Sequence, residues 1–234
     1  MSILERLFIV NPYRRPVFPA PERLEPLDEE GLVAIGGVLE PDILLEAYRK
    51  GIFPWSGEHP VPWYSPDPRM VLVPSEVKVR RTLQQTLRRG HLQVRFDHDF
   101  KGMMGLCGRI RRRGQNGTWI TRNMVRCWVE LHALGYAHSV EVVDAEGVLV
   151  GGLYGMAIGR AFFGESMASV VPDASKVALV HLCQRLDARG FAFIDCQQST
   201  QHMASMGARD IPRARYLELV AEATGAADAW GAAE

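Results

Sequence analysis

Residues 151–197, GGLYGMAIGRAFFGESMASVVPDASKVALVHLCQRLDARGFAFIDCQ, contain the pattern that decides the fold. With the preceding AHSVEVVDAEGVLV they predict a meander of strands, because β-branched and aromatic residues fill the strands and glycine marks the DAEG and IGR turns. Pro172 and Asp173 then open a helix whose apolar residues recur at spacings of three and four, and Gly190 lies where a C-terminal cap belongs. The stretch therefore predicts a meander that continues into a strand–helix–strand unit.

Polar side chains lie at the ends of these strands. Glu165 ends one strand, and the last strand, GFAFIDCQ, places Asp195 and Gln197 two residues apart. A period of two puts both side chains on one face of the strand and turns Cys196 the other way. If that face lines a cleft, a carboxylate and a carboxamide project together, with Glu165 opposite them. From the residues alone, however, an ion pair at a strand end or a helix cap is the more common role of such a carboxylate.

The composition is that of an ordinary globular protein with a sizeable core. The 234 residues suffice for one large domain or two small ones, and Lys plus Arg equals Asp plus Glu at 27 each. The charges are unevenly distributed, because the stretch from Lys78 to Arg126 contains only Asp97 and Asp99 as acidic residues. A solvated helix face explains such arginines as well as a phosphate-binding surface does. The loop IRRRGQNGTW favours the second role, since an aromatic residue directly follows a flexible basic segment.

Residues 1–65 differ in composition from residues 66–234, because they contain most of the prolines. We predict a small N-terminal α+β lobe followed by a C-terminal domain, so that the fold class is α+β (mixed α/β). Within the lobe, Pro41 and Asp42 start a helix that Gly51 ends. Between the lobe and the meander, further helices surround a strand in HLQVRFDHDF. The Ala-rich tail after Ala221 is expected to be frayed.

Neither a metal site nor a disulfide scaffold is indicated by the cysteines. The four residues are widely spaced and contain no C-x-x-C pair. The N-terminus is too charged for a signal peptide, and no run of about 18 apolar residues suggests a membrane span. We therefore expect a cytoplasmic protein without a metal, a cofactor or a membrane partner.

An ordered set of motifs resembles a known family. The motifs are FPW at 53–55, WYSPDPR at 63–69, GTWIT at 117–121, GGLYG at 151–155, FGESMAS at 163–169, ASK at 174–176, DCQ at 195–197 and the stretch HMASMGARDIPR. In this order they resemble the bacterial leucyl/phenylalanyl-tRNA-protein transferases over about residues 18 to 217. No single motif is decisive, but the ordered set is highly specific.

The resemblance implies a function and a fold. Members of this family transfer Leu or Phe from aminoacyl-tRNA to an N-terminal Arg or Lys of a protein, which marks that protein for degradation by the N-degron pathway. The expected partners are thus aminoacyl-tRNA and such proteins, the expected donors are Leu, Phe and less readily Met, and the expected state is a monomer. The C-terminal domain is expected to resemble the Gcn5-related acetyltransferase fold.

The resemblance also assigns site residues. It places Glu165, Asp195 and Gln197 in the active site, where Asp195 takes or relays the amine proton, the Gln197 carbonyl orients the amine and Glu165 holds the cation of the acceptor. Little other machinery is required, because an aminoacyl ester is already activated and a neutral α-amine is a competent nucleophile. Which group first accepts the proton remains open.

Two larger sets of residues are predicted to bind the donor. An acyl pocket is expected from apolar residues near the motifs, which are Trp55, Trp119, Leu153, Phe162, Met167 and Ile194. Such a pocket rejects charged donors, although plain hydrophobic core is the commoner fate of these side chains. Binding of the tRNA phosphates is expected from the arginines of the basic stretch, which are Arg80, Arg81, Arg88, Arg89, Arg109, Arg111, Arg112 and Arg113.

Two other classes of function fit parts of the sequence. A coenzyme A acetyltransferase would suit the meander, helix and strand, but it needs a glycine-rich turn before the helix to bind pyrophosphate. That place is occupied by SMASVVPDASK, which contains no glycine. A non-enzymatic tRNA-binding module would need only the basic stretch, and it would have no need of Asp195 and Gln197 on one strand face.

Overall fold

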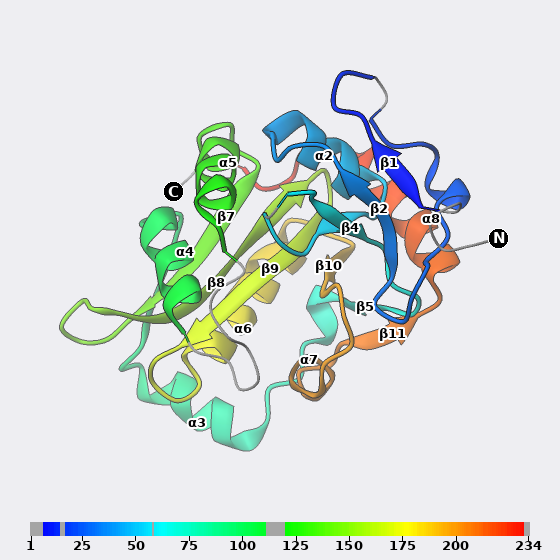
Figure 1. Cartoon of the computed structure of the whole chain (residues 1–234). Coiled ribbons are helices and arrows are strands. Elements are labelled where there is room, and N and C mark those ends of the chain that lie inside the picture. Colours follow the sequence, from blue (N-terminus) through cyan, green and yellow to red (C-terminus); the bar gives the residue numbers. More distant parts are fainter. Residues whose placement is uncertain (1–6, 15–16, 58, 111–119, 232–234) are drawn as a thin grey trace.

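Two β-sheets organise the chain in the computed structural model, which describes residues 7–14, 17–57, 59–110 and 120–231 (Figure 1). The smaller sheet has the strand order β1-β2-β4-β3. Its strands are β1 (Phe8–Val10), β2 (Leu32–Gly36), β3 (Phe53–Pro54) and β4 (Pro62–Tyr64). The helix α2 (Pro41–Arg49) connects β2 to β3 and begins at Pro41, as predicted.

The larger sheet has the order β11-β5-β10-β9-β8-β7-β6. Its strands are β5 (Arg69–Leu72), β6 (Gln93–Phe96), β7 (Ala137–Val143), β8 (Leu149–Ile158), β9 (Ala161–Ser169), β10 (Phe193–Asp195) and β11 (Arg209–Ile211). The predicted meander is confirmed as the antiparallel strands β7, β8 and β9. Helix α6 (Ala174–Ala188) then crosses over to β10, which pairs in parallel with β9.

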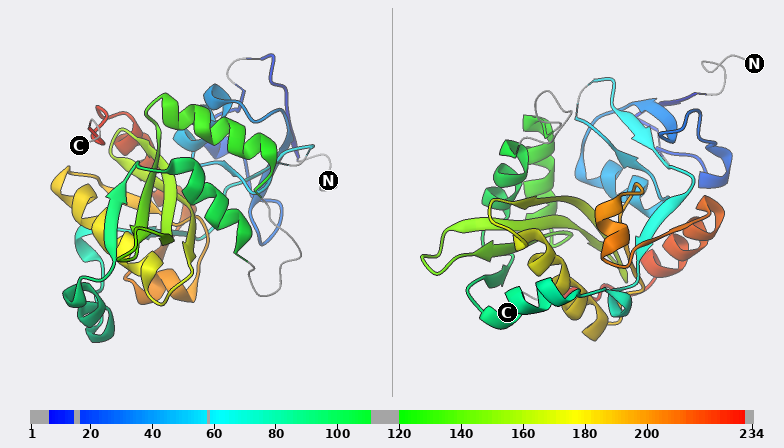
Figure 2. Two further views of the ribbon diagram at one scale, coloured as in Figure 1. Left: turned by 90° about the vertical axis from the view of Figure 1, so that its left-hand side faces the viewer. Right: turned by 90° about the horizontal axis from the view of Figure 1, so that it is seen from below.

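Helices cover both faces of the larger sheet. Seen from below in Figure 2, the strands lie between α6 on one side and α4, α5 and the smaller sheet on the other. The remaining helices are α3 (Arg81–Arg89), α4 (Phe100–Arg109), α5 (Arg122–Ala133), α7 (Gln201–Ser205) and α8 (Arg213–Thr224), with short 3₁₀ turns at Pro21–Arg23 and Pro74–Glu76. The mixed α/β class predicted from the sequence is therefore confirmed.

Two hydrophobic clusters result from the alternation of side chains along the strands. On β9, Phe162 points to the cluster beneath α6, whereas Phe163 points to the cluster beneath α4 and α5. On β10, Phe193 and Ile194 divide in the same way. Successive side chains alternate between the faces, and because both faces are covered the central strands are apolar on both.

The smaller sheet shares a core with one face of the larger sheet. Residues of α2, including Tyr48, belong to the same cluster as Phe163 and Trp128. The strands of the two sheets separate in sequence between Tyr64 and Arg69, close to the expected boundary at residue 65. Because one cluster spans both parts, the division into domains at 1–65 and 66–234 stays a prediction.

Two local predictions are wrong. The last strand ends at Asp195, so Gln197 lies beyond it rather than on the same strand face. The tail is also packed, because α8 continues to Thr224 and Trp230 is buried against His138 with ring centroids 4.0 Å apart. Trp230 Nε1 donates to Asp97 Oδ2 at 3.1 Å, and this distant partner supplies the order that the local sequence does not indicate.

The helices of the described residues are too short or too polar to cross a membrane.

Candidate active site

Glu165 occupies an irregular position in β9. Tyr154 of β8 faces Ser166, whereas the next residue, Gly155, faces Gly164, so that Glu165 is the extra residue of a β-bulge. A Cβ atom on Gly155 would lie 2.3 Å from the carbonyl oxygen of Phe163, and glycine is therefore required for the close approach of the two strands. Bulges redirect a side chain and are frequent beside active sites. Here the bulge places Glu165 within reach of α2.

Two donors hold one oxygen of the Glu165 carboxyl group. Tyr48 Oη donates to Oε1 at 2.5 Å and Gln197 Nε2 donates to the same atom at 2.7 Å. Burial raises the pKa of Glu165 to about 8, with repulsion by Asp195 adding to it, although the two hydrogen bonds act in the opposite direction. At neutral pH the group is therefore mostly protonated. A strongly perturbed carboxyl group in a pocket is a candidate for function.

Asp195 is fully buried and surrounded by donors. Arg69 Nε and Nη2 bind its two oxygens at 2.8 and 2.7 Å, and Tyr216 Oη donates to Oδ2 at 2.8 Å. The backbone N–H of Gln197 donates to Oδ1 at 2.8 Å. Each oxygen thus accepts two hydrogen bonds, which fills the acceptor positions of a carboxylate. This geometry favours an action of Asp195 through Gln197 over direct acceptance of a proton from a substrate.

Gln197 has a left-handed backbone, with φ of 63°. The N–H of Gln198 donates to the carbonyl of Cys196 at 2.8 Å, which closes a three-residue γ-turn around Gln197. This turn is uncommon for a residue with a side chain and costs free energy, so its surroundings must stabilise it. The turn directs the carboxamide of Gln197 toward Glu165.

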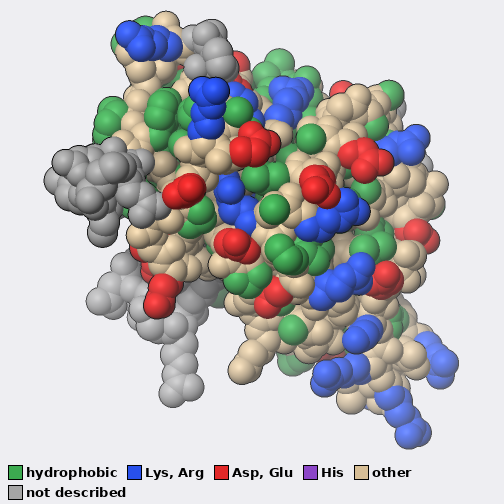
Figure 3. All heavy atoms as spheres, turned by 90° about the vertical axis from the view of Figure 1, so that its right-hand side faces the viewer, with side chains coloured by type: hydrophobic (Ala, Val, Ile, Leu, Met, Phe, Trp, Pro, Cys, Tyr) green, Lys and Arg blue, Asp and Glu red, His purple; other side chains and the backbone are tan. Residues whose placement is uncertain are grey.

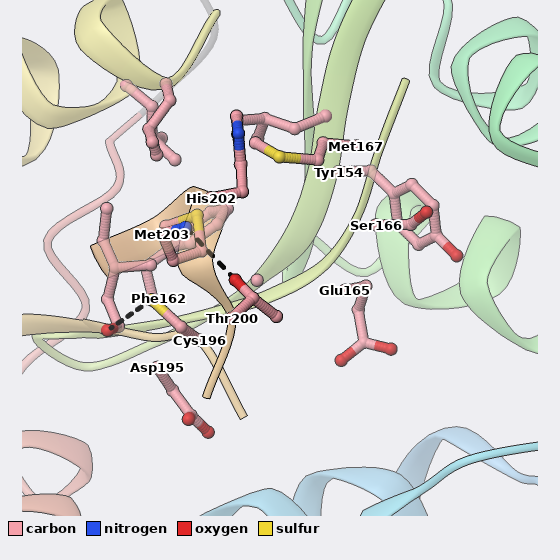
Figure 4. A pocket seen from close by; sticks show the side chains of 15 residues that line it. Tyr154, Phe162, Glu165, Ser166, Met167, Asp195, Cys196, Thr200, His202 and Met203 are labelled. Carbon is pink, nitrogen blue, oxygen red and sulfur yellow. Dashed lines mark hydrogen bonds between the residues drawn. The ribbon is translucent and has the colours of Figure 1, made fainter. Parts of the chain in front are cut away.

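A pocket of about 310 Å³ has Glu165 and Asp195 among its lining residues (Figure 4). Leu153, Phe162, Met167, Leu179, Leu182 and Ile194 supply much of its apolar lining. Figure 4 shows the carboxyl groups of Glu165 and Asp195 pointing away from Met167 and His202. Glu165 and Asp195 therefore lie at the edge of the pocket, and their carboxyl groups are directed away from its apolar interior.

The predicted pocket residues are only partly brought together. Leu153, Phe162, Met167 and Ile194 line the pocket. Trp55 does not line it, since its ring packs at 5.0 Å on Tyr64 within the smaller sheet. Trp119 lies outside the described residues. The four predicted residues that line the pocket thus come from β8, β9 and β10, whereas Trp55 packs beside the smaller sheet.

Four residues of the site were missed by the sequence reasoning. Tyr48 donates a hydrogen bond to Glu165, and Arg69 and Tyr216 both bind Asp195. His202 lines the pocket. The Nε2 atom of His202 is buried without a hydrogen-bond partner among the described residues. Arg69 and His202 stand within the motifs WYSPDPR and HMASMGARDIPR, so their positions carried a signal. Tyr48 and Tyr216 come from helices whose amphipathic pattern also fits plain core residues.

The predicted tRNA-binding arginines that the structure describes do not line the pocket. Arg80, Arg81, Arg88 and Arg89 are exposed at the two ends of α3, and Arg109 is exposed at the end of α4. Arg111, Arg112 and Arg113 lie outside the described residues. On the face shown in Figure 3, acidic and basic side chains are mixed over the upper part, and basic side chains gather at the lower right, at the height of α3 in Figure 1.

One group of side chains among the described residues has the spacing of metal ligands. One ligand atom from each of Asp97, His132 and His138 lies within 4.8 Å of the others. Their polar atoms already bind one another or the backbone, since His138 Nδ1 is 2.9 Å from Asp97 Oδ2 and His132 Nδ1 is 2.8 Å from the carbonyl of Ala137. These contacts explain the cluster as a hydrogen-bonded support for Trp230.

Comparisons with known proteins agree on one family. The profile described as "Leucyl/phenylalanyl-tRNA protein transferase" matches residues 71–221, and the profile of the N-terminal domain of that family matches residues 37–67. The chain is 48% identical to the leucyl/phenylalanyl-tRNA–protein transferase of Myxococcus xanthus (strain DK1622), over 93% of this chain and 92% of that protein. It is 53% identical to the enzyme of the same name from Dechloromonas aromatica (strain RCB), over 86% of this chain and 87% of that protein.

The chain has a distant likeness to a solved structure. L-PGS from Bacillus licheniformis matches 75% of this chain and 56% of that chain, with 11% identity and a TM-score of 0.38. A TM-score this low does not define a shared fold, and the likeness to the Gcn5-related acetyltransferase fold stays a prediction.

Proposed function

The chain belongs to the leucyl/phenylalanyl-tRNA protein transferase family of aminoacyltransferases, and from this membership we propose that it transfers Leu or Phe from aminoacyl-tRNA to the α-amino group of a protein. The observation that carries the proposal is the apolar pocket with Glu165 on its edge and Gln197 bonded to Glu165. Its volume of about 310 Å³ is at the lower end of small-molecule sites, which suits a single amino-acid side chain.

The proposed reaction needs positioning more than strong catalysts. The acceptor amine attacks the ester carbonyl of the donor, a peptide bond forms, and the ribose oxygen of the tRNA leaves with a proton. The second oxygen of Glu165 and the carbonyl oxygen of Gln197 make no hydrogen bond within the described residues, so both can face the amine. Asp195 acts indirectly, by accepting a hydrogen bond from the backbone N–H of Gln197. Holding the amine near the ester is sufficient to accelerate the transfer strongly.

The apolar lining supports Leu and Phe as donors. Burying a charged side chain against Leu153, Phe162 and Ile194 would cost several kcal/mol, so charged donors are rejected. A methylene group is worth only about 1–3 kcal/mol of discrimination. The flexible thioether of Met167 adapts to different shapes, and Met is therefore a tolerated donor.

Glu165 is the proposed partner of the acceptor cation. An N-terminal Arg or Lys carries a positive side chain, and binding beside Glu165 would favour the ionised carboxylate. Such acceptors would be marked for degradation by the N-degron pathway. We further propose that the protein works as a cytoplasmic monomer and binds tRNA phosphates through the predicted arginines at residues 80–89 and 109–113.

One assay tests the proposal against its alternatives. The purified protein is incubated with tRNA charged with Leu, Phe or Asp, and with a peptide that begins with Arg or with Glu. We expect transfer only from Leu- and Phe-tRNA and only to the Arg peptide. Acetylation of the same peptide from acetyl coenzyme A would support an acetyltransferase instead. Binding of tRNA without any transfer would support a binding module.

A further inference from the structure

Arg69 forms a buried brace behind the active site. Its side chain is 1% exposed, and its guanidinium group lies between two aromatic rings, 4.7 Å from the centroid of Phe53 and 4.5 Å from that of Tyr216. Both rings hold the guanidinium plane in place while its fork binds both oxygens of Asp195. Burial alone would lower the pKa of Arg69, but the carboxylate of Asp195 raises it, so the group remains charged.

Tyr216 completes the support of Asp195 from α8. Its hydroxyl donates to Asp195 Oδ2 at 2.8 Å and accepts from Arg69 Nη2 at 3.2 Å. Burial raises the pKa of Tyr216 well above its ordinary value, so the hydroxyl keeps the proton that it donates. All four contacts of the Asp195 oxygens are therefore donors, and the carboxylate is fixed in one orientation.

The fixed carboxylate in turn holds the backbone of Gln197. Asp195 Oδ1 accepts from the N–H of Gln197 two residues later, which is the contact of an Asx-turn. This contact and the γ-turn bond stabilise a left-handed residue that would otherwise return to extended backbone. An extended Gln197 would carry its side chain away from Glu165.

We propose that Arg69 and Tyr216 are positioning residues, which act through Asp195 to hold Gln197 in the left-handed turn that presents its carboxamide to Glu165 at the edge of the pocket. The proposal rests on the proposed function for its kinetic consequences, but not for its structural ones. It also assigns Asp195 a supporting role in place of direct proton transfer.

A double-mutant cycle tests this coupling. Tyr216→Phe removes one hydrogen bond to the carboxylate, and Arg69→Lys keeps the charge but removes the fork. Each is expected to lower kcat by roughly tenfold or more, with the KM for Leu-tRNA unchanged, because hydrogen bonds to charged groups are the strong ones. In a Gln197→Ala background, Tyr216→Phe should lower kcat by less than about twofold, since the group that it positions is already absent. Additive losses would overturn the proposal.

Arg213 offers a matched control. It is another buried arginine, and it binds Ser65 Oγ at 2.8 Å and the carbonyl of Pro21 at 3.0 Å without a hydrogen bond to Asp195. Arg213→Lys should lower stability, and its effect on kcat should be the same with and without Gln197→Ala. If the Arg213 variant reproduces the non-additivity of Tyr216→Phe, general loosening explains both and the brace is refuted.

A measurement without substrate separates this proposal from the proposed function. Hydrogen exchange of the Gln197 amide should be faster by about tenfold or more in Tyr216→Phe than in the wild type, while amides of α6 stay protected. An unchanged exchange rate at Gln197 would overturn the brace, whatever the enzyme transfers. If the wild type transfers neither Leu nor Phe, the proposed function fails and this exchange measurement still decides the brace. If Arg69→Lys does not fold, Tyr216→Phe alone decides whether the brace exists.

Discussion

The Glu165→Gln substitution should make the free energy of unfolding less dependent on pH. In the folded protein the pKa of Glu165 is raised to about 8, whereas in the unfolded chain it is about 4.3. Between these values the folded state holds a proton that the unfolded state has released, so raising the pH favours unfolding. The stability contributed by this proton is complete below about pH 4.3 and is lost as the pH rises through about 8. At about 1.4 kcal/mol per pH unit, the upper limit is about 5 kcal/mol.

Glutamine keeps the hydrogen-bond pattern but cannot ionise. Its carbonyl can accept from Tyr48 and from Gln197 as the protonated acid does. Solvent in the pocket screens part of the effect, so we expect the free energy of unfolding of the wild type to fall by about 2–4 kcal/mol relative to Glu165→Gln between pH 5 and pH 8.5. Urea unfolding at half-unit steps measures this difference. The exposed Glu146→Gln is the control and should track the wild type. A difference between wild type and Glu165→Gln that is constant with pH would refute the reasoning.

Three further predictions concern the substrates. Phe162→Ala should shift the Leu to Phe transfer ratio toward Phe by about tenfold. Phe193→Ala removes a buried ring on the opposite sheet face and should lower stability at an unchanged ratio. An invariant ratio in both variants would show that Phe162 does not form the donor pocket. Replacing the exposed arginines Arg80, Arg81, Arg88 and Arg89 by Ala should reduce the salt slope of tRNA binding by roughly one for each phosphate that is no longer bound, and an unchanged slope returns them to a solvated face. Binding of an Arg peptide at pH 7 should release up to about one proton, seen as a dependence of the calorimetric enthalpy on the buffer, because a cation lowers the pKa of Glu165; release that persists in Glu165→Gln would contradict this.

The regular part of the fold could be predicted from periodicity. The meander and α6 each combine one clear period with glycine at their turns or ends, and local pattern and tertiary packing agree there. Trp230 shows the limit of such reasoning. Its indole is ordered by His138 and Asp97, which lie far away in the sequence, and no residue near Trp230 predicts that contact.

The site itself departs from the regular pattern at two points. An alternation of two, continued through GFAFIDCQ, would have placed Gln197 on the face of Asp195, but the Asp195 side chain binds the Gln197 N–H and ends the strand. An Asp side chain can bind the backbone N–H two residues later, and this turn-forming tendency competes here with strong strand formers. The bulge at Glu165 has a weaker signal, since the only local indication is the pair Gly155 and Gly164.

The two irregularities meet because of strand register. β10 pairs in parallel with β9, with Asp195 opposite Phe163, so two residues further along both strands Gln197 comes opposite Glu165. In a regular parallel pair, both side chains would stand side by side and perpendicular to the sheet. The bulge on one strand and the γ-turn after the other instead turn the two side chains toward each other, where Tyr48 from α2 adds the third contact. Helix α2 lies in the N-terminal part of the chain, which therefore contributes the Tyr48 hydrogen bond to Glu165 at the edge of a pocket whose lining comes from Leu153 onward. The protonation state of Glu165 therefore depends on the packing of the two sheets against each other as well as on its own strand.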